Sequence, residues 1–184
     1  MSSGDTVALD DRLRLFCGLR LPPDVAARLS DWQQEHLQRG RIVPPANLHI
    51  TLAFLGSRPR RELESIVAAL RDAALEAEPI ELEVVRYREG RSAGMLVLRD
   101  DSGAATRLAD DVQRRLEALG VYGREGRDWL PHVTVVRFRE RPRLRPPVPE
   151  LGSIRPSDAA AYLSKLRQGG AEYVVLESVT LGGT

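Results

Sequence analysis

The hydrophobic and polar positions of this chain follow two spacings, and each spacing predicts one kind of element. Apolar residues that alternate with polar ones, or that form short β-branched runs, predict strands. Apolar residues that recur every three or four positions over a longer stretch predict amphipathic helices. The expected strands cover residues 13–19, 48–55, 80–87, 95–98, 130–138, 160–166 and 172–181. The expected helices cover residues 24–38, 58–77 and 104–119, and the proline-rich stretch 141–149 is expected to be irregular.

Two of the expected strands carry the same short motif. The motif occurs as Leu48-His49-Ile50-Thr51-Leu52 and as Pro131-His132-Val133-Thr134-Val135, with the histidines 83 positions apart (132 − 49). A long expected helix follows the first motif, and another precedes the second. This arrangement indicates two related halves, each of which supplies one strand of a shared site.

The motif has the residue types that acid and base catalysis on a phosphate needs. Side chains alternate along a strand, so His49 and Thr51 share one face, and His132 and Thr134 share another. Opening a cyclic phosphodiester requires a base that deprotonates water and an acid that protonates the leaving alkoxide. An unperturbed histidine has a pKa of about 6.5, so both forms are accessible at neutral pH. The motifs therefore predict a phosphoesterase in which the histidines are the acid and base and the threonine hydroxyls bind phosphate oxygens.

Two arginines and a tryptophan flank the second motif. Arg137 and Arg127 are candidates for offsetting the charge that builds in the transition state. Strict alternation places Arg137 on the opposite strand face from His132, so it reaches the phosphate only if the strand bends or bulges, or if its long side chain curls round. Trp129 is a candidate for stacking on the terminal base, and packing beside the strand is the alternative.

Three other kinds of site are less consistent with these residues. A catalytic zinc site needs a third protein ligand, and Asp128 is the only acidic residue close before the second motif. We therefore expect no metal and no other cofactor. Cys17 lies within an apolar strand, where packing is the usual role of a cysteine. A nucleotide-binding module without turnover remains an alternative, although binding alone does not need two titrating groups.

The composition is that of a globular domain, and it excludes few classes of binding partner. The chain has 184 residues, of which 42% are hydrophobic and 29% charged, and one cysteine, which excludes an intramolecular disulfide. A formal net charge of +1 argues against a protein that grips long nucleic acids by charge alone. No stretch is long and apolar enough to span a bilayer, and the first residues do not read as a secretory signal. We expect a cytoplasmic monomer.

The motifs resemble those of the 2H phosphoesterase superfamily, and the chain is most similar to its RNA 2′,3′-cyclic phosphodiesterases, the group once called 2′-5′ RNA ligases. The resemblance rests on four stretches and extends from about Leu13 to Leu181. These stretches are Arg14-Leu15-Phe16, the first signature at 47–56, the second signature with its arginine at 131–137, and a C-terminal hairpin at 162–166 and 170–173. Family members often have an arginine or aromatic residue where this chain has Leu130.

The resemblance implies a bilobed α+β fold. Each lobe would have an antiparallel sheet with outer helices, and a pseudo-two-fold relation would place a central active-site cleft between them. With a disordered tail at 1–12, residues 13–184 would form this single domain. The resemblance also implies metal-independent hydrolysis of a cyclic phosphate on RNA ends or small nucleotides to a 2′-phosphomonoester. His49 would donate the proton to the 3′ oxygen and His132 would activate water, with Thr51, Thr134 and Arg137 binding phosphate. Joining of 2′,5′ RNA ends is the reverse reaction and would use the same residues.

Overall fold

The computed structural model describes residues 11–183, so nearly all of the tail expected at 1–12 lies outside the described residues. The strands are β1 (Arg12–Arg20), β2 (Arg41–Ile42), β3 (His49–Pro59), β4 (Glu83–Glu89), β5 (Ala93–Arg99), β6 (His132–Arg137), β7 (Asp158–Arg167) and β8 (Gly170–Thr180). The helices are α2 (Pro23–His36), α3 (Leu63–Leu75) and α4 (Ala104–Ala118), with short 3-10 turns at Pro45–Asn47 and Arg60–Glu62.

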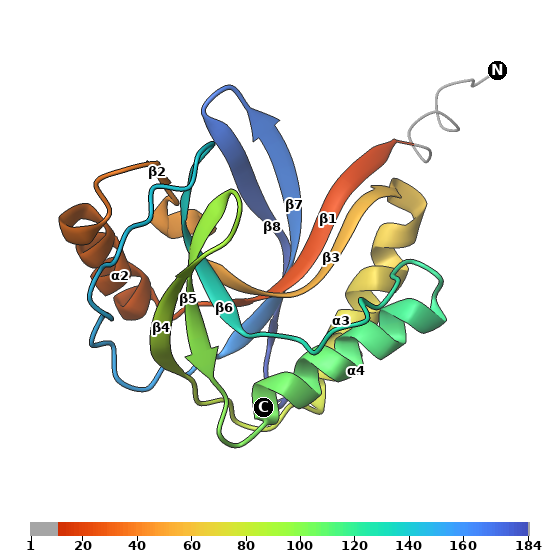
Figure 1. Ribbon diagram of the computed structural model, residues 1–184. Coiled ribbons are helices and arrows are strands. Elements are labelled where there is room, and N and C mark those ends of the chain that lie inside the picture. The colour runs from red at the N-terminus through yellow and green to blue at the C-terminus, as the bar shows by residue number, and fades with distance from the viewer. Residues whose placement is uncertain (1–10, 184) are drawn as a thin grey trace.

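All strand pairs are antiparallel, and the strands follow the order β4-β5-β6-β3-β1-β7-β8, with β2 added beside β6. The two halves of this curled sheet meet at one residue pair, Ile50 of β3 with Val133 of β6. Figure 1 shows β4, β5 and β6 diverging from β3, β1, β7 and β8 on the two sides of this region. The expected α+β fold with antiparallel strands is confirmed, and its two sheets are continuous through this single pair.

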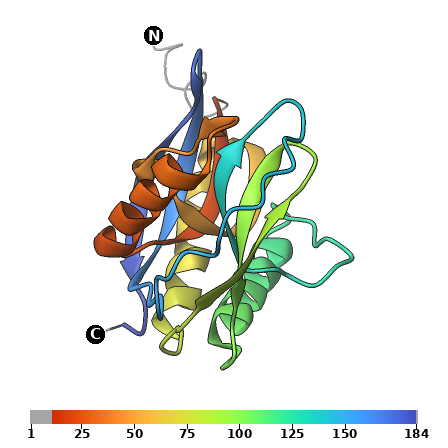
Figure 2. The same cartoon turned by 60° about the vertical axis from the view of Figure 1, so that its left-hand side comes forward.

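The helices lie on the outer faces of the two halves. Helices α3 and α4 pack against each other and against β3, β7 and β8, and α2 lies on the opposite side of the molecule (Figure 1, Figure 2). Helix α2 is fixed to the β6 half by Gln33, a fully buried residue. Its side-chain amide donates to the carbonyl oxygens of Val43 and Val135 at 3.1 and 2.8 Å. Because a buried unpaired amide N–H is costly, these bonds tie the helix to β6 and to the residue that follows β2.

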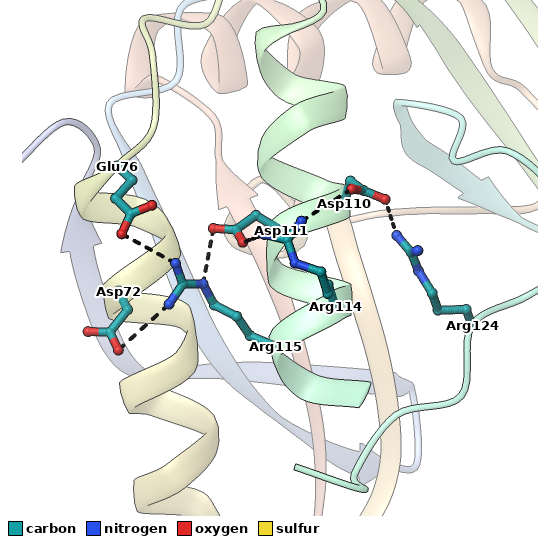
Figure 3. A network of polar contacts seen from close by, with 7 residues as sticks. All are labelled: Asp72, Glu76, Asp110, Asp111, Arg114, Arg115 and Arg124. Atoms are coloured by element: carbon teal, nitrogen blue, oxygen red, sulfur yellow. Dashed lines mark hydrogen bonds and ion pairs between the residues drawn. The ribbon is translucent and has the colours of Figure 1, made fainter. Parts of the chain in front are cut away.

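An ion-pair network joins α3, α4 and the loop that precedes β6 (Figure 3). Arg115 of α4 bonds to Asp111 at 3.0 Å and to Glu76 near the end of α3 at 3.3 Å. Arg124, in the loop, pairs with Asp110 of α4. These groups are partly exposed, so each pair stabilises the fold only weakly. They matter for function because they hold the 121–130 loop, which leads directly into the second motif. The network also contains Asp72 and Arg114.

Strand β3 is longer than the sequence pattern predicts, and helix α3 is shorter. The helical spacing predicted a helix over 58–77, whereas β3 continues to Pro59 and α3 begins at Leu63. Pairing explains the difference, because β1 remains hydrogen-bonded to β3 as far as the pair Arg12 and Pro59. Tertiary pairing therefore overrides the local helical preference of residues 58–62.

Candidate active site

The site is built where β3 crosses β6. Because Ile50 pairs with Val133 in antiparallel register, each histidine lies beside the threonine of the other motif. The neighbours are His49 with Thr134, and His132 with Thr51. The two histidines are diagonal neighbours, a relation that separates Cα atoms by about 7–8 Å in antiparallel sheets. Four polar side chains thus surround one small area at the junction of the two halves.

Both motif strands contain a β-bulge directly after the threonine. Leu52 has no partner on β1, and Val135 has no partner on β5. A bulge resets the alternation of side chains, so the residue after each bulge is buried like the bulged residue itself. Arg137 therefore returns to the face that carries the second histidine. The bulge that Arg137 requires is therefore present in β6. The matching bulge at Leu52 of β3 explains why Phe54, at the equivalent place of the first motif, is 50% exposed.

Each histidine is held in one tautomer by its own backbone. Nδ1 of His49 lies 2.7 Å from the carbonyl oxygen of Asn47, and Nδ1 of His132 lies 2.8 Å from that of Leu130. A carbonyl oxygen only accepts, so Nδ1–H is the donor in both rings and Nε2 is the atom left for proton transfer. In the free protein, Nε2 of His49 accepts from the Thr51 hydroxyl at 2.9 Å. A bound phosphate would compete for that hydroxyl.

Aromatic rings surround His49 on the face opposite the main core. Ring centroids of Phe16, Tyr173 and Tyr162 lie 4.7, 5.4 and 5.6 Å from that of His49. Gly18 of β1 completes the seat, because a Cβ atom there would lie 3.3 Å from the imidazole and 3.0 Å from the carbonyl oxygen of Ile50. Sequence reasoning assigned no role to Phe16 or Gly18. The available signal was that both lie on the non-core face of a strand otherwise lined by leucines.

The C-terminal hairpin is attached to the start of β3 through Asn47. Its side-chain amide donates to the carbonyl oxygen of Ala171 at 2.8 Å, and its side-chain oxygen accepts from the backbone N–H of Tyr173 at 3.3 Å. The backbone carbonyl of the same Asn47 orients His49. One residue therefore connects the ring of the first histidine to the strand that brings Tyr173 against it.

Burial lowers the pKa of His49 from its usual value near 6.5 to about 4. The hydrogen bond to the Asn47 carbonyl opposes this effect, while the positive charges of His132 and Arg137 lower the pKa further. The His49 ring is therefore neutral at pH 7.

We expect phosphate binding to raise the pKa of His49. An opposite charge within about 4–6 Å typically raises a histidine pKa by roughly 1 to 3 pH units. The measurement is an NMR pH titration of the imidazole signals with and without saturating inorganic phosphate, with His36 as the internal control. A His49 that titrates near pH 6.5 in the free protein, or that does not respond to phosphate, would contradict this account.

The same depressed pKa makes the fold sensitive to acid. A histidine of the unfolded chain takes up its proton near pH 6.5, whereas folded His49 does so only near pH 4. The contribution of neutral His49 to the free energy of unfolding is therefore fully present above pH 6.5 and is lost as the pH falls toward 4. The free energy of unfolding, measured at several pH values between 4 and 7, therefore gives an independent check on the His49 pKa obtained by NMR.

Two hollows flank the crossing, and they differ in size and chemistry. The larger, of about 600 Å³, is lined by His132 and Thr51 and by the exposed ring of Phe54. The smaller, of about 180 Å³, is lined by His49, Thr134 and Arg137. The first hollow combines the aromatic rings of Phe54, Tyr122 and Trp129 with charged side chains of both signs. The second is lined by two arginines and no carboxylate, so it is cationic. Each hollow thus holds the histidine of one motif and the threonine of the other.

The remaining sequence candidates lie around the larger hollow or away from the site. Trp129 lines that hollow, and its indole N–H donates to the carbonyl oxygen of Thr51 at 3.0 Å, so it is at least a packing residue. Arg127 also lines it, with an 81% exposed side chain paired to Glu125. Cys17 is fully buried, and burial raises the pKa of its thiol to about 12, which makes it a poor nucleophile.

Two further observations concern the described part of the chain. Residues 11–183 contain no cluster of three or more histidine, cysteine, aspartate or glutamate side chains that could hold a metal ion. Among the helices within those residues, none is long and apolar enough to cross a membrane.

Comparison with known proteins identifies the family. Residues 19–89 match the family model described as LigT like Phosphoesterase. The chain is 33% identical to the RNA 2′,3′-cyclic phosphodiesterase of Thermus thermophilus, over 93% of this chain and 91% of that protein. The chain belongs to this family of LigT-like phosphoesterases. A second RNA 2′,3′-cyclic phosphodiesterase, from Methanothermobacter thermautotrophicus, is 30% identical over 87% of this chain and 91% of its own length.

Solved structures with the LigT fold agree with the architecture described above. The crystal structure of TT0787 from Thermus thermophilus superposes with a TM-score of 0.78 at 30% identity, covering 93% of this chain and 99% of that one. Escherichia coli LigT, solved in complex with 3′-AMP, superposes with a TM-score of 0.79 at 21% identity over 93% and 99% of the two chains. The bilobed, curled sheet is therefore the fold of these LigT-like phosphoesterases.

Proposed function

We propose that this protein hydrolyses terminal 2′,3′-cyclic phosphates, on RNA ends or small nucleotides, to 2′-phosphomonoesters. The observation that carries the proposal is the crossing of β3 and β6. It gathers two backbone-oriented histidines, two threonines and, through a bulge, Arg137 around one crossing that two hollows flank. Membership in a family whose named relatives are RNA 2′,3′-cyclic phosphodiesterases supports the same reaction.

The two hollows suggest how the substrate lies. On a ribose ring, the base leaves from C1′ and the 5′ arm leaves from C4′, at opposite ends, while the cyclic phosphate bridges the edge between them. With the phosphorus at the crossing, the base would enter the larger hollow, where Phe54 and Trp129 offer aromatic surface. The 5′ arm would then point to the smaller, cationic hollow. The 3′ oxygen lies beside C4′, so this orientation places it on the side of His49.

This orientation gives each histidine one task. Nε2 of His132 takes a proton from water as the water oxygen attacks phosphorus. The bond between phosphorus and the 3′ oxygen breaks, and Nε2–H of His49 gives its proton to that oxygen. The product is a 2′-phosphate with a free 3′ hydroxyl. Arg137 and the Thr51 and Thr134 hydroxyls stabilise the non-bridging oxygens, which carry the added charge of the transition state.

His49 must be protonated for this role, and the substrate supplies the reason. The ring is neutral in the free protein because burial and neighbouring positive charges oppose its protonation. A cyclic phosphate brings a negative charge between His49, His132 and Arg137 and so reverses the electrostatic part of that effect. The acid is therefore formed on substrate binding, which couples proton uptake to the correct ligand.

The decisive experiment combines product identification with metal removal. Cytidine 2′,3′-cyclic phosphate and an RNA oligomer with a cyclic-phosphate end are incubated with the protein in ¹⁸O-water and excess EDTA. We expect one ¹⁸O atom in the product phosphate, a 2′-phosphate by ³¹P NMR, and the same rate as without EDTA. Acid and base chemistry between two histidines requires no cation.

Three outcomes would contradict the proposal. Binding without turnover would favour a non-catalytic nucleotide-binding module. A 3′-phosphate product would exchange the leaving group and overturn the assigned substrate orientation. A loss of rate in EDTA that zinc or manganese restores would show that a metal takes part.

A further inference from the structure

The smaller hollow contains a second arginine, which the proposed reaction does not use. Arg41 of β2 is the direct cross-strand partner of Arg137 of β6, so the two side chains share one face of the sheet. Directly opposed like charges destabilise a pair of strands. Within residues 11–183, no carboxylate forms an ion pair with either arginine. Two adjacent, uncompensated guanidinium groups at the edge of a phosphate site point to an anionic ligand.

The guanidinium of Arg41 is placed by the turn of the C-terminal hairpin. A Cβ atom added at Gly170 would lie 2.9 Å from Cζ of Arg41 and 3.1 Å from both of its terminal nitrogens. The absent side chain at Gly170 therefore makes room for the guanidinium, and Arg41, Gly169 and Gly170 all line the smaller hollow. Arg41 is exposed, but its guanidinium lies against Gly170. This contact lowers the conformational entropy that the side chain loses when it binds a ligand.

Charge balance assigns the two arginines to different phosphates. A 2′,3′-cyclic phosphate is a diester with one negative charge, which Arg137 alone offsets. The charge of Arg137 also reaches His49 and lowers its pKa, which ties Arg137 to the reacting centre. A second negative charge on the substrate would balance Arg41. In a nucleic acid, the next charge is the phosphate on the 5′ side of the terminal nucleoside.

We propose that Arg41, seated on Gly170, binds the 5′ phosphate of the terminal nucleotide and so selects RNA ends over mononucleosides without that phosphate. The inference rests on the proposed function, because the orientation described above directs the 5′ arm into the smaller hollow. Arg41 is then a specificity-determining residue. Arg137 serves the reacting phosphate.

The test compares three substrates that differ only on the 5′ side. They are cytidine 2′,3′-cyclic phosphate, the same nucleotide with a 5′-monophosphate, and a dinucleotide with a cyclic-phosphate end. The wild-type protein should have a higher kcat/KM for the second and third than for the first. Arg41→Gln should lower kcat/KM by roughly 10-fold or more for those two, because a charge-assisted hydrogen bond is lost. The first substrate should lose much less.

Two further variants make the result specific. Gly170→Ala keeps the charge but crowds the guanidinium, and it also strains the hairpin turn because Gly170 has a φ of 132°. It should reproduce the selective loss in protein whose thermal unfolding shows that the fold persists. Arg39→Gln removes an exposed arginine two positions away that does not line the hollow, and it should leave all three rates unchanged.

The outcomes separate this inference from the proposed function. Equal losses of Arg41→Gln on all three substrates would place Arg41 on the reacting phosphate and overturn the inference. No loss on any of them would overturn it as well. Absence of turnover by the wild-type protein on every substrate would instead overturn the proposed function.

Discussion

Replacing His132 with alanine should lower kcat by about 10²–10⁴-fold, because a positioned general acid or base typically contributes that factor. His49→Ala should have an effect of similar size. The substrate should still bind, since Arg137 and the threonines remain, so KM should change much less than kcat. The double variant should be scarcely worse than either single variant, because both groups act in one concerted step.

A matched control keeps this prediction specific. His36 is the third histidine, lies at the end of α2 against Trp32, and lines neither hollow, so His36→Ala should retain wild-type kcat. Thermal unfolding of each variant would show that the fold persists, which matters most for His49 because its ring packs on Phe16. If His132→Ala kept kcat within a few-fold of the wild type, the two-histidine mechanism would be wrong.

Replacing Arg137 with alanine should lower kcat/KM by roughly 10–100-fold, the loss expected when one charge-assisted hydrogen bond to phosphate is removed. Arg137→Lys should recover only part of this loss, because an ammonium group lacks the planar fork of the guanidinium. The alanine variant should also raise the pKa of His49, since the charge of Arg137 lowers it. Steady-state kinetics and the His49 titration measure these two effects separately.

Stability distinguishes a binding role for Arg137 from a structural one. Arg137 lies opposite Arg41, and removal of one of two facing like charges should not destabilise the strands. We therefore expect Arg137→Ala to lose activity with an unchanged or slightly higher melting temperature. Arg139→Ala, an exposed arginine outside both hollows, is the matched control. A comparable loss of activity in Arg139→Ala would indicate a diffuse charge effect instead of a specific contact.

The sequence by itself determined the local elements and the reacting groups. Alternation along β1 and helical spacing along α4 are local patterns, and the observed elements agree with them within a few residues. The two His-x-Thr motifs could be recognised because their polar residues interrupt apolar strands in the same way twice. Alternation along a strand depends only on that strand, so His49 and Thr51 could be placed on one face without knowledge of the fold.

Only the tertiary structure decided how those groups meet. Strand pairing is non-local, and the antiparallel register of Ile50 with Val133 places each histidine beside the threonine of the other motif. The bulges at Leu52 and Val135 depend on which residues of β1 and β5 lie opposite, so no property of either motif strand alone revealed them. They are the reason that Arg137 reaches the site despite strict alternation.

The seats of the charged and aromatic side chains were likewise beyond the sequence pattern. The proposed role of Arg41 depends on its strand partner Arg137, 96 positions away (137 − 41), and on Gly170 in the C-terminal hairpin. The low pKa of His49 arises from burial among groups that the fold brings together from three other strands, among them Phe16, Tyr162 and Tyr173. The residue type makes His49 able to transfer a proton. Desolvation and neighbouring charges exist only in the folded chain, and they set the direction in which its pKa shifts.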